Sequence, residues 1–234
     1  MCPLSLRQNP AEPERDPPLA QWPAGELREL IRRRVSRSVA AAALEDDWRL
    51  GAVPADVRVE LRRYFPQAPT RAAVLVPIVD RGDSLTVLLT ERASDLRHHA
   101  GQISFPGGRI EPDDASVVAA ALREAREEIG LARERVDIVG LLPDHLIVSG
   151  FRVTPVVGFV AADYALQLDR REVADAFEVP LPFLLDPANH VRRRRQFEDH
   201  EVELTDLPWG ERNIWGATAG MLLTLYRVLR GEDG

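Results

Sequence analysis

Three glutamates on one predicted helix, placed behind two adjacent glycines, constrain the fold of this chain more than any other feature. The glycines are Gly107 and Gly108, and the glutamates are Glu124, Glu127 and Glu128. At positions i, i+3 and i+4 the carboxylates lie on one side of a helix, where like charges cost about 0.2–0.5 kcal/mol per pair. A divalent cation would offset this repulsion, because hard cations such as Mg²⁺ take carboxylate oxygens as ligands. The segment therefore predicts a metal-binding helix next to a glycine loop.

Apolar residues around this cluster recur at helical spacing and predict a buried stripe. They are Val118, Ala121, Leu122, Ala125 and Ile129. At about 100° per residue, the three glutamates fall together on the flank away from that stripe. We expect Asp113 or Asp114 to cap the start of the helix, and Gly130 to end it in a left-handed conformation. A solvated acidic face would explain a lone pair of glutamates, but not the ordered combination of glycines, arginine and glutamates.

The same residues resemble the Nudix box, Gly-x5-Glu-x7-Arg-Glu-apolar-x-Glu-Glu-x-Gly-apolar. When the count starts at Gly108, Arg123 comes one residue later than this spacing allows. Either the early acid of the box is an aspartate, or the loop carries one extra residue, so the roles of Glu111, Asp113 and Asp114 stay open. The resemblance implies an α/β/α sandwich with a mixed sheet, and an Mg²⁺- or Mn²⁺-dependent hydrolase of diphosphates.

A second motif, directly upstream, resembles the signature of coenzyme A pyrophosphatases. Residues 88–108 match every specified position of Leu-Leu-Thr-x-Arg-Ser/Ala-x3-Arg-x3-Gly-x3-Phe-Pro-Gly-Gly. The extra residue in the box is typical of the same subfamily, and the whole resemblance covers about residues 70–230. It implies cleavage of coenzyme A, including acyl or oxidised forms, to 4′-phosphopantetheine and adenosine 3′,5′-bisphosphate. The alternative substrate is another nucleoside diphosphate derivative, such as ADP-ribose or a dinucleotide.

The resemblance also assigns roles within the predicted metal site. The expected metal ligands are Glu124, Glu127, Glu128 and a carbonyl of the glycine loop at Gly108. A bound cation polarises the diphosphate and lowers the pKa of a water molecule, whose proton a carboxylate accepts. Glu124 and the distal Glu172 are the candidate bases, and Glu128 completes the catalytic set. A solvated loop glutamate is the alternative explanation for Glu172.

Two arginines of the upstream motif are candidates for substrate binding. Guanidinium groups match phosphate oxygens bidentately, so Arg92 and Arg97 are expected to contact the diphosphate or the 3′-phosphate of coenzyme A. Either arginine could instead pair with a neighbouring acid and brace the loop. Gly107 and Gly108 complete the expected substrate-binding set, because glycine lets the backbone approach a ligand closely. A tight turn explains the two glycines equally well.

The composition limits the choice of partner and compartment. A net charge of −7 argues against a broad nucleic-acid surface. We therefore interpret the run Arg192–Arg195 as a strand or loop with exposed arginines.

Cys2 is the only cysteine, so a reducing compartment fits. Neither a signal peptide nor an apolar run of membrane length is present, and we expect a cytoplasmic protein that binds a small molecule. A homodimer is compatible with the sequence.

We expect the chain to divide into an N-terminal arm with a helical extension, residues 1–69, and, by the resemblance, a Nudix hydrolase domain, residues 70–234. Residues 1–24 are rich in proline and are expected to form a loose arm.

A non-catalytic module with the Nudix fold would usually lose the acids, whereas all three are present here. The expected helices are Glu26–Leu44 and Trp215–Arg230, and the expected strands are Ala72–Asp80, Ser84–Arg92, Val136–Leu142 and Val153–Ala161.

Overall fold

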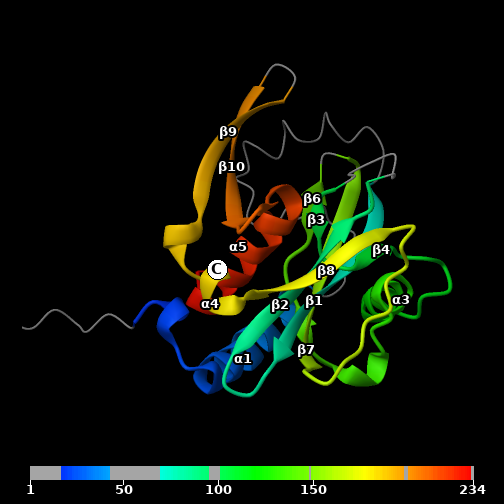
Figure 1. Cartoon of the computed structure of the whole chain (residues 1–234), viewed down its shortest axis with the longest axis horizontal. Helices are drawn as coiled ribbons and strands as arrows, with labels where there is room; N and C mark the ends of the chain where they lie inside the picture. Colours follow the sequence, from blue (N-terminus) through cyan, green and yellow to red (C-terminus); the bar gives the residue numbers. More distant parts are fainter. Residues whose placement is uncertain (1–16, 43–68, 95–100, 148, 198–199, 233–234) are drawn as a thin grey trace, which may run out of the picture.

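The computed structural model describes residues 17–42, 69–94, 101–147, 149–197 and 200–232 (Figure 1). The helices in these ranges are α1 (Ala24–Ala42), α3 (Val117–Ile129), α4 (Leu181–Leu184) and α5 (Gly216–Arg230), with the 3-10 helices η1 (Leu19–Gln21), η2 (Arg133–Arg135) and η3 (Pro187–Asn189). The strands are β1 (Thr70–Asp80), β2 (Leu85–Arg92), β3 (Ile103–Ser104), β4 (Gly107–Arg109), β5 (Val136–Leu141), β6 (His145–Ile147), β7 (Phe151–Ala161), β8 (Val173–Pro180), β9 (Val191–Phe197), β10 (His200–Trp209) and β11 (Arg212–Ile214).

The large sheet is mixed, because β1 and β7 run parallel whereas its other strand pairs are antiparallel. β1 and β7 pair in continuous register, from Thr70 with Phe151 to Asp80 with Ala161. On one side of this pair, β1 contacts β2 and β4, and β2 in turn contacts β3 and β8; on the other side, β7 contacts β5 and β6. Strands that are covered on both faces must be apolar on both faces, and β1 and β7 are almost continuously apolar.

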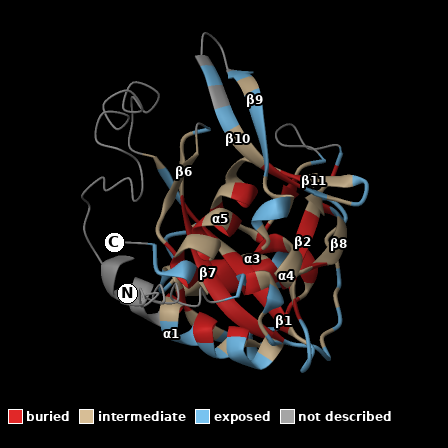
Figure 2. Cartoon of the chain, turned by 90° about the vertical axis from the view of Figure 1, so that its left-hand side faces the viewer, coloured by how far each residue is buried: buried red, intermediate tan, exposed pale blue. Residues whose placement is uncertain are grey.

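Two hydrophobic clusters, one on each face of this sheet, give the molecule three layers (Figure 2). Ala73, Leu75 and Val79 of β1 pack with the apolar stripe of α3. Val76 and Ile78 of the same strand pack with α1 and α5 on the opposite face. The predicted α/β/α sandwich with a mixed sheet and an N-terminal helix is therefore confirmed.

The N-terminal segment packs against the body of the protein over the residues that the structure describes. The expectation of a loose arm over residues 1–24 is wrong from residue 17 onward, because Leu19 is buried and Trp22 packs against the same cluster. Leu27 and Ile31 of α1 are fully buried there as well. Neither α1 nor any other helix of the described ranges is long and apolar enough to cross a membrane.

Most of the elements predicted for residues 70–234 are confirmed. β1, β2, β5, β7 and α5 begin and end within two residues of their predicted bounds. The sequence analysis does not predict β8, an edge strand whose partly exposed residues lack a regular apolar alternation. The boundary between the extension and the hydrolase domain stays a prediction, because residues 43–68 lie outside the described ranges.

The run of four arginines lies on β9, in the hairpin that projects from the body in Figure 1, and pairs with acids on β10. The pairs are Arg192–Glu203 (3.3 Å), Arg194–Glu201 (3.7 Å), Arg193–Asp206 (3.3 Å) and Arg195–Asp206 (2.8 Å). Asp206 is fully buried at the base of the hairpin, where Asn213 also donates a hydrogen bond of 2.8 Å to it. Each of the four arginines is thus paired with an acid of β10, which favours the structural interpretation of this run over nucleic-acid binding.

A second ionic cluster fixes the edge strand β8 to its neighbours. Glu178 of β8 accepts hydrogen bonds from Arg81, from Thr86 of β2 and from Tyr164, the last at 2.5 Å. Burial by itself would raise the pKa of Glu178, but these hydrogen bonds outweigh it and lower the pKa to about 2. The ionised carboxylate therefore stabilises the attachment of β8.

Replacing Glu178 by glutamine should make the stability of the protein less dependent on acid pH. The folded-state pKa lies below the reference value of 4.5, so the stabilisation is fully present above pH 4.5 and is lost as the pH falls through about 2. At pH 7 we expect Glu178→Gln to lower the free energy of unfolding by about 1–3 kcal/mol. Urea unfolding from pH 7 to pH 3 would measure both effects. Glu203→Gln, which breaks an exposed ion pair, is the control and should change stability by less than about 1 kcal/mol.

Candidate active site

The helix α3 that carries the glutamates starts at a serine cap. Ser116 is the N-cap, and its hydroxyl oxygen accepts a hydrogen bond of 3.1 Å from the backbone N–H of Ala119. The expectation that Asp113 or Asp114 caps the helix is therefore wrong. Gly130 ends the helix with φ 70°, in the left-handed conformation that the sequence predicts.

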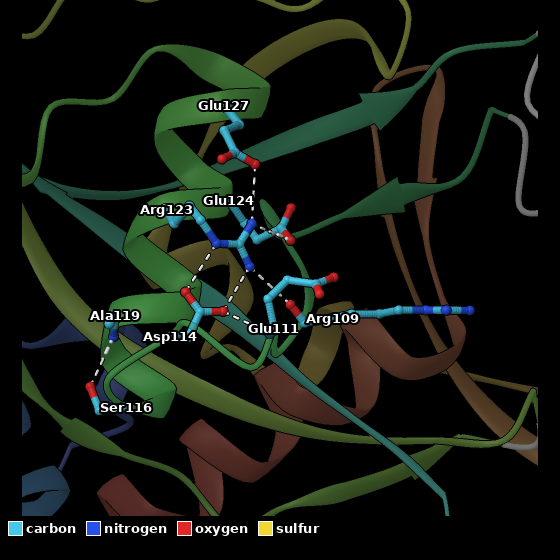
Figure 3. Close-up of polar contacts among 8 residues, drawn as sticks. All are labelled: Arg109, Glu111, Asp114, Ser116, Ala119, Arg123, Glu124 and Glu127. Carbon is cyan, nitrogen blue, oxygen red and sulfur yellow. Dashed lines mark hydrogen bonds and ion pairs between the residues drawn. The ribbon is translucent and has the colours of Figure 1, made fainter.

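Arg123 is the centre of the polar network in Figure 3, and it pairs with the carboxylate of Asp114. The Arg123 guanidinium donates to both carboxylate oxygens of Asp114, at 3.0 and 2.9 Å, and to the backbone oxygen of Arg109 at 3.0 Å. The same group pairs with Glu124 at 2.9 Å and with Glu127 at 3.1 Å. Asp114 thus braces the arginine that orients two of the three glutamates.

Glu128 lies under the glycine loop rather than in solvent. Its residue is 4% exposed, and Oε2 accepts a hydrogen bond of 3.0 Å from the backbone N–H of Gly107. The sequence places all three glutamates away from the apolar stripe but does not predict the burial of Glu128, which arises because β4 covers this part of α3. Burial raises the pKa of Glu128 to about 7, and the charge of Glu124 adds to this effect.

Close approach explains both glycines of the loop. A Cβ atom on Gly108 would lie 2.6 Å from the carboxylate carbon of Glu124. A Cβ atom on Gly107 would lie 2.4 Å from the backbone oxygen of Ala73 and 2.6 Å from the Cα atom of Val74. Gly108 therefore makes room for a glutamate side chain, whereas Gly107 makes room for the neighbouring strand β1.

The remaining acids lie at the rim of this cluster. The Glu127 side chain is 59% exposed and contacts Arg123. Glu172 is exposed, and its charge raises the pKa of both Glu124 and Glu128, so it lies near them. Its loop is fixed by two backbone hydrogen bonds of 2.9 Å, from Ala93 N–H to the Glu172 oxygen and from Asp169 N–H to the Glu128 oxygen. The structure therefore brings the distal glutamate to the cluster, which sequence spacing could not establish.

Arg92 is the one predicted substrate-binding side chain whose surroundings the structure describes. It lies at the end of β2, and its charge acts to lower the pKa of Glu128, so the two groups are close. Its Nε atom is buried and has no hydrogen-bond partner among the described residues. Glu91, a candidate partner, lies 3.5 Å from Arg212 instead. Arg97 lies outside the described ranges.

The candidate ligand atoms are of the chemical type that a hard divalent cation prefers. Glu124, Glu128 and the backbone of Gly108 offer oxygen atoms only, the ligands that Mg²⁺ prefers. Burial raises the pKa of both carboxylates and repulsion from neighbouring glutamates adds to it, and a bound cation would offset both effects. Within the described ranges, however, no three acidic, histidine or cysteine side chains converge on one point. Glu127 faces Arg123 instead, so it would have to turn to join the other two.

A protein-family model and several known proteins match this chain. The NUDIX domain family matches residues 69–201. Relatives described as "Uncharacterized Nudix hydrolase NudL" include one from Cronobacter sakazakii, 44% identical over 158 residues, 66% of this chain and 80% of the relative. Another, from Pectobacterium atrosepticum, is 43% identical over 155 residues, 65% of this chain and 79% of the relative.

Solved structures with a similar fold include the MutT protein from Methanosarcina mazei Go1, with 19% identity and a TM-score of 0.46 over 70% of this chain and 96% of that one. The NUDIX domain of Shewanella oneidensis NrtR, complexed with ADP ribose, has 22% identity and a TM-score of 0.40 over 55% of this chain and 85% of that one.

Alanine at the two glycines should separate folding from metal binding. Gly107→Ala forces a methyl group against the backbone of β1, so we expect the free energy of unfolding to fall by about 1–3 kcal/mol. Gly108→Ala displaces only the flexible end of Glu124, so the melting temperature in chelator should change little. The affinity for Mn²⁺, measured by calorimetry, should nevertheless fall about 10–100-fold.

Gly25→Ala serves as the matched control for both variants, because nothing lies within 4 Å of a Cβ atom at that position. Its stability and Mn²⁺ affinity should stay close to those of the wild type. Unchanged Mn²⁺ affinity in Gly108→Ala would contradict the assignment of Glu124 as a ligand.

Proposed function

The chain belongs to the Nudix family, and we propose that this hydrolase of nucleoside diphosphate derivatives acts on coenzyme A. In the proposed reaction, a water oxygen attacks one phosphorus of the diphosphate and the bridging P–O bond breaks. The products are 4′-phosphopantetheine and adenosine 3′,5′-bisphosphate. The proposed enzyme uses Mg²⁺ or Mn²⁺ and works in the cytoplasm on a small molecule.

The observation that carries the choice of substrate is the signature over residues 88–108, together with its place in the fold. This segment runs from β2 through β3 to β4 and so connects Arg92 to the glycine loop. Phe105 is buried, and the backbone oxygen of Pro106 accepts a hydrogen bond of 2.9 Å from Leu75 of β1. The described end of the motif, residues 105–108, therefore lies against β1 and Glu128, which supports a role in substrate choice.

The protein groups have separate tasks in the proposed mechanism. Glu124, Glu128 and the carbonyl of Gly108 would hold the cation, which supplies positive charge at the diphosphate and a water of lowered pKa. Arg123 pairs with Glu124, and its proposed task is to hold this glutamate in place. The guanidinium of Arg92, with its unpartnered buried Nε, binds diphosphate oxygens.

Glu172 is the better candidate for the general base. One oxygen of Glu124 is occupied by Arg123, and one oxygen of Glu128 is occupied by the Gly107 N–H. The Glu172 carboxylate is exposed and forms no hydrogen bond with the described residues. It can therefore accept the proton of the attacking water while the other two glutamates serve as ligands.

A substrate panel with product identification by mass spectrometry tests the proposed function. We expect turnover of coenzyme A to the two named products, complete loss of turnover in excess chelator, and recovery with Mg²⁺ or Mn²⁺. ADP-ribose and dinucleotides should be poor substrates. Faster hydrolysis of ADP-ribose than of coenzyme A would refute the choice of substrate and leave the metal chemistry standing, whereas full activity in chelator would refute the metal requirement.

Replacing Glu172 by glutamine should lower kcat by about 10²–10⁴-fold, because the variant keeps the shape but cannot accept a proton. The Mn²⁺ affinity should stay within a small factor of the wild-type value, since Glu172 is not assigned to the metal. Glu134→Gln, at an exposed glutamate of η2, is the control and should keep full activity. If kcat of the Glu172 variant remained near wild type, the role of base would pass to Glu124.

A further inference from the structure

Arg109, the last residue of β4, differs from the other arginines around the glycine loop. Residues of a strand alternate between the two faces of a sheet, and Gly108 faces Glu124 on the α3 side. Arg109 pairs in register with Ala72, which belongs to the cluster on the opposite face. Its side chain accordingly extends away from the carboxylates in Figure 3.

The backbone and the side chain of Arg109 are each held in place. Its carbonyl oxygen accepts a hydrogen bond of 3.0 Å from Arg123, the residue that also holds Glu124 and Glu127. Its guanidinium carbon lies 5.5 Å from the centre of the Phe151 ring, within the range of a cation–π contact. A guanidinium that is already oriented loses less conformational entropy when it binds a ligand.

Among the residues that the structure describes, no acid pairs with Arg109. The residue is exposed and forms no ion pair within the described ranges, and neighbouring Glu111 does not pair with it. A polyanionic substrate that approaches Glu124 and Glu128 needs positive charge for each of its anionic groups. Arg92 is near enough for its charge to act on Glu128 and is proposed to serve the diphosphate, whereas Arg109 lies one residue beyond the loop and on the opposite face.

We propose that Arg109 binds a second anionic group of the substrate, separated from the diphosphate by a sugar ring. Resting on the proposed function, this group is the 3′-phosphate of coenzyme A. Guanidinium and phosphate form charge-assisted, bidentate hydrogen bonds, so the contact is specific as well as attractive. Arg109 is then the residue that distinguishes coenzyme A from its dephospho form, and Arg92 is not.

The experiment compares kcat/KM for coenzyme A and for dephospho-coenzyme A in four proteins: wild type, Arg109→Ala, Arg109→Lys and Arg92→Ala. We expect Arg109→Ala to lower kcat/KM for coenzyme A by about 10–100-fold, mainly through a higher KM. The kcat/KM for the dephospho form should hardly change. Arg109→Lys should recover part of the loss, because it keeps the charge but not the bidentate geometry. Arg92→Ala should lower kcat/KM for both substrates by a similar factor. Arg133→Ala, at an exposed arginine of η2, is the control.

A binding measurement separates this inference from the proposed function. By calorimetry, the wild type should bind adenosine 3′,5′-bisphosphate more tightly than AMP, and Arg109→Ala should abolish that preference. Equal losses on both substrates, or a wild type without preference for the 3′-phosphate, would overturn the role of Arg109. A wild type that keeps the preference but does not hydrolyse coenzyme A would overturn the proposed function alone.

Discussion

The close approach of strand β4 to helix α3 is the contact on which the candidate site depends. Gly107 donates its N–H to Glu128, and Gly108 leaves the space that the Glu124 carboxylate occupies. Any larger residue would separate the strand from the helix or displace a carboxylate. The glycine loop therefore covers the acidic site at close range, and this close packing is more important than the flexibility of its backbone.

This contact buries two negatively charged carboxylates close together, and neighbouring groups offset the resulting energetic cost only in part. Two glutamates are withdrawn from water next to each other, and burial disfavours the charged form of both. Arg123 neutralises the exposed side of the cluster and is in turn braced by Asp114. The buried side receives one backbone N–H and the more distant charge of Arg92. The remaining imbalance is what gives the site its affinity for positive charge in the proposed mechanism.

Sequence patterns could predict the helix and the long strands, because each of them buries a regular face. They could not predict the burial of Glu128, which results from Gly107 of a distant strand. The cap illustrates the same limit: Asp114 and Ser116 are both good caps, and tertiary pairing with Arg123 decides between them. Motif spacing selects three glutamates as candidates, but only the fold shows that they differ in exposure and partner.

The parallel pairing of β1 with β7 has a consequence for the order of folding. β1 ends at Asp80 and β7 begins at Phe151, and the glycine loop and all of α3 lie in the segment between them. Closing so long a segment carries an entropic cost, and non-local strand pairing of this kind slows folding. During synthesis, the glutamates leave the ribosome well before the strand that completes their scaffold. We therefore expect a growing chain to carry the acids long before it carries a site, so that metal binding would follow folding and not nucleate it.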